Sequence, residues 1–174
     1  MLVFVDETST NISLTRKYGR APKGERAIGK VPRNWGSPTT LVAGLSGKGV
    51  GAPMMLEGAM DTAAFVVYVR EVLAPELSPG QVVVMDNLSV HKARAVEELI
   101  EARGCQLLFL PAYSPDLSPI ELAFSKIKEF LRAAGARTQA ALEEAIAQAI
   151  ETVTAADAEG FFRHCGYRPL AQLP

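Results

Sequence analysis

Short apolar runs alternate with polar, glycine- and proline-containing segments along most of the chain. Apolar runs bounded by turn formers predict buried strands, whereas apolar residues spaced three and four apart predict helices. The pattern predicts strands at about residues 2–6, 39–45, 50–56, 82–86 and 105–110. It predicts helices at about residues 61–73, 91–103, 119–134, 139–153 and 156–165.

The order of these elements predicts the fold class. The second and third strands are joined by Ser46-Gly47-Lys48-Gly49, which is a hairpin signal. The later strands alternate with helices, which is typical of parallel pairing. We therefore expect an α/β domain with a mixed sheet, antiparallel in one part and parallel in the other, flanked by helices. Pro75 and the segment 78–80 are expected to end the first helix.

Two of the apolar runs end in an acid, and a third acid lies near a helix start. Val5 precedes Asp6, Met85 precedes Asp86, and 34 residues (87–120) separate Asp86 from Glu121. Reacting groups gather at the carboxyl ends of strands in open α/β sheets. Three converging carboxylates suit two hard divalent cations, which can clamp both oxygens of a phosphodiester exchange. The pattern therefore indicates a metal-dependent enzyme that cuts and joins nucleic acid.

Each of these acids also has a purely structural explanation. Asp6 and Asp86 could end strands through local backbone hydrogen bonds. Segment 118–121, Ser-Pro-Ile-Glu, has the form of a capping box in which Glu121 reaches back to the N-cap. Glu7 is a rival for Asp6, and only one of the two can face the site because a strand alternates its faces. Spacing alone leaves these alternatives open.

Three polar residues near the acids are candidates for accessory roles. Asn87 could orient Asp86 or contact a phosphate, or it could be a turn residue. His91 could contact the scissile phosphate or a metal-bound water, or it could serve in packing at a helix start. Asp116 lies in a Ser-Pro-Asp turn and is expected to be a turn residue rather than a ligand.

Size and composition narrow the class of protein. The chain has 174 residues, 48% hydrophobic and 21% charged, which is enough for one ordinary globular domain. No apolar stretch approaches the length of a membrane span, and no signal peptide opens the chain. Cys105 and Cys165 are far apart, so neither a zinc site nor a disulfide framework is indicated. A reducing cytosol is the default location.

The net charge of −1 argues weakly against nucleic acid as a partner, but the distribution of charge argues for it. Residues 8–38 form a long polar excursion that holds seven of the 18 basic residues, opposed only by Glu25: Arg16, Lys17, Arg20, Lys23, Arg26, Lys30 and Arg33. Such a segment can track a phosphate backbone, although charge runs are commonly solvated loops. Trp35 could stack on a base, or it could anchor the loop to the core, which is the favoured alternative.

Four segments carry a resemblance to a known family: FVDETS at 4–9, YGRAPKGER at 18–26, VVMDNLSVHKA at 83–93 and LPAYSPDLSPIE at 110–121. They resemble the catalytic domain of DDE transposases of the mariner-type superfamily, nearest to its bacterial insertion-sequence branch. The resemblance implies a ribonuclease H-like fold and cut-and-paste DNA transposition. It also implies two Mg²⁺ or Mn²⁺ ions held by the catalytic residues Asp6, Asp86 and Glu121.

The same resemblance sets expectations about partners and organisation. It implies transposon ends and target DNA as partners, a homodimer in the active complex, and action on DNA in the bacterial cytoplasm. Family members carry helix-turn-helix modules ahead of the first catalytic strand, whereas here Met1 is close to Asp6. We therefore expect residues 1–174 to be a single catalytic domain. It would be an excised domain, a second reading frame joined to an upstream helix-turn-helix polypeptide, or a decayed copy.

Two other functions remain in competition. One is a ribonuclease H-like nuclease, which the segment LPAYSPDLSPIE disfavours. The other is a catalytically silent DNA-binding domain derived from a transposase, which the intact set of three acids disfavours.

Overall fold

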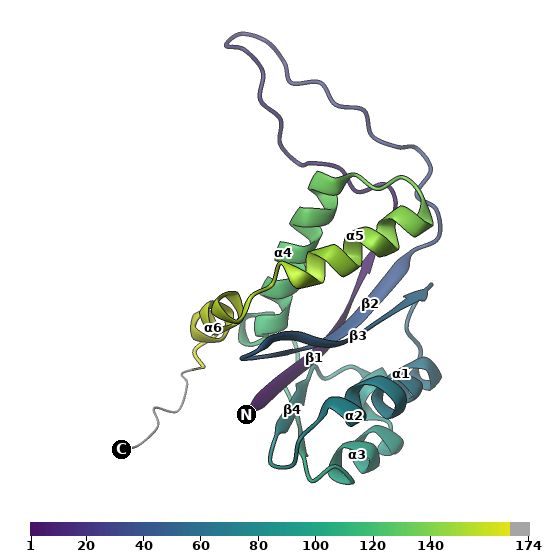
Figure 1. The fold of residues 1–174 in the computed structure, drawn as a ribbon, viewed down its shortest axis with the longest axis vertical. Coiled ribbons are helices and arrows are strands. Elements are labelled where there is room, and N and C mark those ends of the chain that lie inside the picture. The colour runs from purple at the N-terminus through teal and green to yellow at the C-terminus, as the bar shows by residue number, and fades with distance from the viewer. Residues whose placement is uncertain (168–174) are drawn as a thin grey trace.

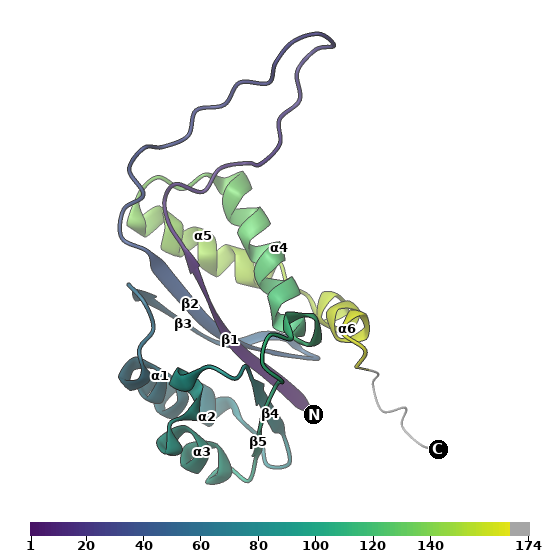
Figure 2. The same cartoon turned by 180° about the vertical axis from the view of Figure 1, so that it is seen from behind.

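The computed structural model describes residues 1–167, which form a mixed five-stranded sheet between two layers of helices (Figures 1 and 2). The strands are β1 (Leu2–Thr10), β2 (Thr39–Ser46), β3 (Gly49–Glu57), β4 (Val82–Met85) and β5 (Gln106–Phe109). Their order in the sheet is β3-β2-β1-β4-β5. β1 pairs antiparallel with β2 and parallel with β4, so the expectation of a mixed sheet is confirmed.

The helical elements cover both faces of this sheet. They are α1 (Thr62–Tyr68), η1 (Val69–Leu73), α2 (Ala74–Glu76), η2 (Ser89–Lys92), α3 (Arg94–Glu101), η3 (Pro115–Leu117), α4 (Pro119–Ala134), α5 (Gln139–Glu151) and α6 (Ala155–His164). Phe4 of β1 packs into the core formed with α4, α5 and α6, whereas Val3 and Val5 pack into the core formed with α1, η1 and α3. The alternation of strand side chains therefore divides the core in two.

The helix predicted at residues 119–134 has the same bounds as α4. It carries a buried stripe that includes Ile120, Phe124, Ile127 and Leu131 and packs against β1 and β2. Gly135 ends the helix with φ 61°, a left-handed conformation that glycine adopts without steric cost. The apolar period and the terminal glycine together determine this helix.

β1 is longer than predicted and runs to Thr10 instead of ending at Asp6. Its parallel pairing with β4 stops at Val5 opposite Met85, but its pairing with β2 continues as far as Thr10 opposite Thr39. Pairing with β2 causes this extension of β1, and the local sequence does not reveal that pairing. Asp6 is therefore held inside a strand, at the point where β1 loses its parallel neighbour.

The first predicted helix does not end at Pro75, which was a wrong expectation. A π-helical turn, η1, widens the helix so that the Ala74 N–H donates to the Val69 carbonyl, and the chain stays helical to Glu76. Proline has no N–H, and a wider turn accommodates this loss. The helix predicted at 91–103 instead starts with the 3₁₀ turn η2, followed by α3.

The capping box predicted at the start of α4 is not formed. Ser118 is the N-cap and Pro119 the first helical residue, but no side-chain hydrogen bond caps this helix within residues 1–167. The Ser118 N–H, which Glu121 would have satisfied, donates to the Pro115 carbonyl at 3.0 Å. The Glu121 side chain is exposed and is free for another role.

A capping box forms instead at α6. Thr154 accepts from the Asp157 N–H, while the Asp157 carboxylate accepts from the Thr154 N–H. The same carboxylate forms a 2.7 Å salt bridge to Lys126 of α4. This contact ties α6 to the helix that contributes most to one core.

Residues 11–38, here called the basic loop, extend beyond α4 and α5 as a long excursion (Figure 1). Residues 16–31 of it are exposed, and so is every charged residue of the loop. In the part of the chain that the structure describes, no helix is both long and apolar enough to cross a membrane.

The two capping sites make a direct comparison possible. Glu121→Ala should change the free energy of unfolding by less than about 0.5 kcal/mol, because no cap is lost. Thr154→Ala should cost about 1 kcal/mol, because it removes a formed cap. Urea unfolding of both variants measures this difference, and a larger loss for Glu121→Ala would mean that a cap forms there in solution.

Candidate active site

A cavity of about 320 Å³ lies where β4 ends and α4 begins. All three predicted acids line it: Asp6 from β1, Asp86 directly after β4, and Glu121 from the first turn of α4. Asp6 and Asp86 arrive together because Val5 and Met85 are paired neighbours in the parallel part of the sheet. The fold therefore brings residues far apart in sequence to one place.

Asp6 has an unusual electrostatic environment. Burial raises the pKa of its carboxyl, and the Glu7 N–H, which donates to Oδ1 at 2.8 Å, lowers it. The negative charges of Glu7, Glu121 and Asp86 raise it further, to about 7. Like charges close together in a partly buried site disfavour ionisation. A bound cation would relieve this repulsion.

The donor atoms of the cavity suit a hard divalent cation, since Mg²⁺ and Mn²⁺ prefer carboxylate oxygens. Across residues 1–167, however, no three His, Cys, Asp or Glu side chains lie close enough together to form a ready-made metal site. A cation would have to draw the carboxylates closer than they lie here. The residues fit the ion in chemical kind, because all three supply carboxylate oxygens.

Asp86 is bonded to a buried histidine. His91 is 0% exposed, with Nδ1 2.6 Å from Asp86 Oδ1 and Nε2 2.9 Å from Glu7 Oε2. The Leu88 N–H also donates to Asp86 Oδ1, at 3.0 Å. Burial lowers the pKa of the His91 imidazole, but the hydrogen bonds and charges of Glu7 and Asp86 outweigh burial and raise it above 6.5.

This arrangement separates the roles of Asp6 and Glu7. Asp6 lines the cavity, whereas the side chain of Glu7 bonds His91. The His91 ring also packs against Phe65, with centroids 4.5 Å apart. Enclosed in this way, it does not face the cavity, so the packing alternative describes its place better than a phosphate contact. Asn87 is exposed and lines the cavity, and its proposed accessory role stays a prediction.

Glu7 as the partner of His91 was not foreseen from the sequence. The two residues are 84 positions apart, and no local pattern links them. The nearest available signal was the alternation of β1, which sends Glu7 to the face opposite Asp6.

The basic loop lines a second cavity, of about 550 Å³, together with the C-terminal end of α4 and the residues that follow it. Basic residues from both segments line it: Arg16, Lys17, Lys30, Arg132 and Arg137. Among the described residues no acid lines this cavity. Arg137 also donates to the carbonyls of Ile12 and Leu14, at 3.0 and 2.9 Å. Arg132 and Arg137 were not among the candidates from sequence, because only the fold brings them beside the loop.

All seven basic residues predicted to contact DNA are exposed. Trp35 is 66% exposed, so the expectation that it anchors the loop to the core is wrong. The loop's apolar contacts with the core come from Ile12 and Leu14 near its start, whereas residues 33–38 around the indole are exposed.

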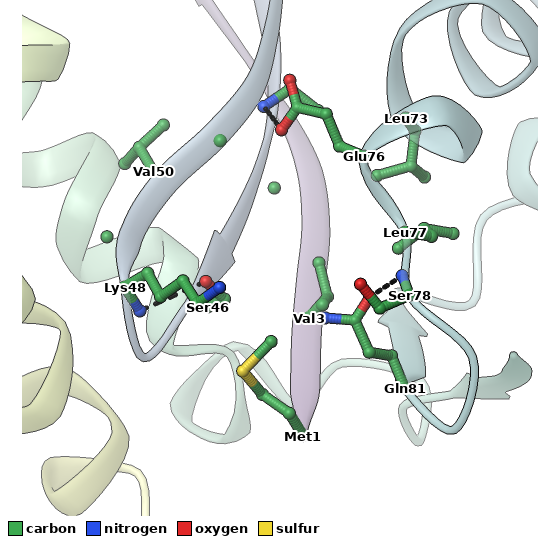
Figure 3. A pocket seen from close by; sticks show the side chains of 14 residues that line it. Met1, Val3, Ser46, Lys48, Val50, Leu73, Glu76, Leu77, Ser78 and Gln81 are labelled. Carbon is green, nitrogen blue, oxygen red and sulfur yellow. Dashed lines mark hydrogen bonds between the residues drawn. The ribbon is translucent and has the colours of Figure 1, made fainter.

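A third hollow, of about 210 Å³, lies near the start of β1 (Figure 3). Glu76 is the single carboxylate among its described lining residues, and its Oε2 already accepts from the Ala52 N–H at 2.9 Å. The hollow therefore offers neither a pair of acids nor a set of metal ligands. The cavity lined by Asp6, Asp86 and Glu121 is the candidate active site.

The mixed sheet with helices on both faces is a ribonuclease H-like fold. The family model described as DDE superfamily endonuclease matches residues 1–143, and the chain belongs to this family. None of the curated proteins compared with the chain matches it.

Solved structures of Mos1 transposase share the fold. A pre-cleavage Mos1 transpososome has a TM-score of 0.69 and 20% identity over 95% of this chain and 52% of that chain. A mariner Mos1 paired-end complex with Mg has a TM-score of 0.66 and 21% identity, over 95% of this chain and 53% of that chain. The Mos1 catalytic domain has a TM-score of 0.61 and 16% identity over 95% and 75%. This chain thus spans about half the length of the first two.

The raised pKa of Asp6 predicts how stability depends on pH without metal. The folded state binds the Asp6 proton more tightly than the unfolded state, so this group costs stability as the pH rises from 3.8 toward about 7. The free energy of unfolding of Asp6→Asn should therefore exceed that of the wild type by a margin that grows between pH 5 and pH 8. The growth should be on the order of 2 kcal/mol after allowing for solvent screening.

Urea unfolding in metal-free buffer at several pH values measures this change. Added Mg²⁺ should stabilise the wild type and not the variant. A difference that does not vary with pH would contradict the environment assigned to Asp6.

Proposed function

We propose that this chain is the metal-dependent catalytic domain of a cut-and-paste DNA transposase. It hydrolyses the phosphodiester at an element end and frees a 3′-hydroxyl. This hydroxyl then attacks a phosphodiester of the target DNA in the same cavity, so that the new bond forms as the target strand's 3′ oxygen leaves. The observation that carries the proposal is that acids from β1, the end of β4 and the start of α4 line one cavity. Membership of the DDE superfamily endonucleases supports it.

Three carboxylates are assigned to hold two Mg²⁺ or Mn²⁺ ions. The carboxylate oxygens of Asp6, Asp86 and Glu121 would be the ligands of these ions. Bound there, the ions would activate water and stabilise the leaving 3′ oxygen, so no protein nucleophile is required. Structures of Mos1 complexes include one with Mg and one with Mn, which supports this choice of ion.

The basic loop and the end of α4 are assigned to the phosphate backbone of DNA. Arg132 lies eleven residues after Glu121 on α4, which is about 16 Å along the helix axis. The basic cavity would therefore hold phosphates away from the bond that is cut, on the flanking DNA. The Mos1 structures include a complex with the left transposon end, in keeping with such a partner.

The wider organisation is also a proposal. Segments 83–93 and 110–121 support a place in the bacterial insertion-sequence branch of the mariner-type superfamily. We assign residues 1–174 to a single catalytic domain, and recognition of the element ends to a helix-turn-helix module, either in the same protein or in an upstream polypeptide. Two copies would act together on DNA in the bacterial cytoplasm.

Removing any one of the three acids should abolish cleavage. The rate of Mg²⁺-dependent nicking of element-end DNA should fall by more than about a hundredfold in each of Asp6→Ala, Asp86→Ala and Glu121→Ala. This loss exceeds the roughly 10- to 100-fold that is usual when a residue that only orients a metal ligand is removed. Circular dichroism should show an unchanged fold. The exposed Asp116 is the matched control, and Asp116→Ala should cleave normally.

The result also separates the competing functions. Substantial cleavage by any of the three variants would reject the assignment of the acids. A wild type that binds DNA and never cleaves it, even when joined to an end-recognising helix-turn-helix module, would favour a silent binding domain. Preferential cleavage of RNA in hybrids would favour a nuclease.

Neutralising the basic loop should weaken DNA binding without regard to sequence. Changing Arg20, Lys23 and Arg26 to Gln removes phosphate contacts, and each lost contact should lower the slope of log affinity against log salt by about 0.9 on duplex DNA. Binding over a salt series, on element-end and random duplexes, measures this.

A matched control changes three exposed cations on other elements, Arg70, Arg94 and Arg163, to Gln. That variant should keep the wild-type slope. An unchanged slope in the loop variant would instead identify the loop as a solvated surface.

A further inference from the structure

An ion-pair network around a buried histidine connects β1, which carries Asp6, to Asp86, which directly follows β4. His91 lies between Asp86 and Glu7 and has no exposed surface. We propose, resting on the function proposed above, that Glu7 and His91 are positioning residues that hold Oδ1 of Asp86 and leave Oδ2 available to a divalent cation.

The hydrogen bonds of Asp86 are made by one of its two carboxylate oxygens. Oδ1 accepts from the Leu88 N–H and from His91 Nδ1. A carboxylate held by two donors on one oxygen has a fixed orientation, and its second oxygen can meet a ligand without further ordering. Outer partners of this kind commonly orient the carboxylates and imidazoles around metals.

Glu7 influences both strand acids at once. Its backbone N–H donates to Asp6 Oδ1 at 2.8 Å, and its side chain reaches Asp86 through His91. Because Asp6 and Glu7 are neighbours on β1, a shift of this strand would move the Asp6 carboxylate directly and the Asp86 carboxylate through Glu7 and His91. Glu7 therefore sets the position of Asp86 relative to Asp6.

Stability alone does not account for this network. The side chains of Glu7 and Asp86 keep 20% and 37% of their surface exposed, but His91 keeps none. Taking the charged imidazole out of water is costly, and apolar residues of similar volume often fill such sites at equal or better stability. Phe65 and the surrounding core already offer an apolar environment for a hydrophobic residue at position 91. What an apolar residue could not supply is a donor to Asp86.

The test compares two variants that lose the same charge. Glu7→Gln keeps an oxygen that accepts from His91, whereas Glu7→Ala removes it. Binding of Mn²⁺ to the full chain without DNA is measured by isothermal titration calorimetry, and the Mn²⁺ concentration for half-maximal nicking is measured separately. DNA binding in EDTA reports on the rest of the protein.

Glu7→Ala should bind Mn²⁺ about 10- to 100-fold more weakly than the wild type and should need correspondingly more Mn²⁺ for nicking. Glu7→Gln should recover most of this loss. DNA binding in EDTA should stay the same in both. Equal Mn²⁺ affinity of Glu7→Ala and wild type, or equal loss in the Gln and Ala variants, would overturn the positioning role.

Two further variants distinguish positioning from loss of packing and from failure of the proposed function. Phe65→Leu disturbs the core beside His91 and should lower the melting temperature while keeping Mn²⁺ affinity; a loss of affinity equal to that of Glu7→Ala would overturn the proposal. Asp86→Ala should abolish the Mn²⁺ response that Glu7 modulates. A wild type that binds Mn²⁺ yet never nicks DNA, even when joined to an end-recognising helix-turn-helix module, would refute the transposase function, while calorimetry would still decide the role of Glu7.

Discussion

The parallel pairing of β1 with β4 is the constraint on which the rest of the site depends. It runs from Leu2 opposite Val82 to Val5 opposite Met85, so the residues that follow on both strands emerge at the same level. β1 also remains paired with β2 beyond this point, which holds Asp6 within regular strand structure. α4 then packs across β1 and β2 and brings Glu121 to the same cavity.

The site concentrates negative charge where the fold partly excludes water. Burial and three neighbouring carboxylates raise the pKa of Asp6 to about 7. On the opposite face of β1, His91 meets Glu7 and Asp86, and its pKa is raised by their charges despite burial. Such an arrangement costs stability in the absence of a cation, which is common where a structure is shaped for binding rather than for stability alone. A cluster of basic residues lies elsewhere, around the basic loop and the end of α4.

The hydrogen bonds around Ser118 remove a competing explanation for one acid. A capping role would have accounted for Glu121 without any chemistry. The 3₁₀ turn η3 satisfies the Ser118 N–H through the Pro115 carbonyl, so the glutamate is not needed there. Its side chain is exposed and lines the cavity, so Glu121 is available for the role proposed for it in the site.

The sequence by itself determined the order of the elements, the bounds of α4 and the candidate acids, because apolar period, proline and glycine act within a few residues. It also determined the cluster of positive charge in the basic loop. Only the tertiary structure decided the extension of β1 along β2, the link from Glu7 to His91 and the meeting of Arg132 with the loop. Each of these depends on contacts between residues far apart in the chain, and local patterns carry no information about such contacts.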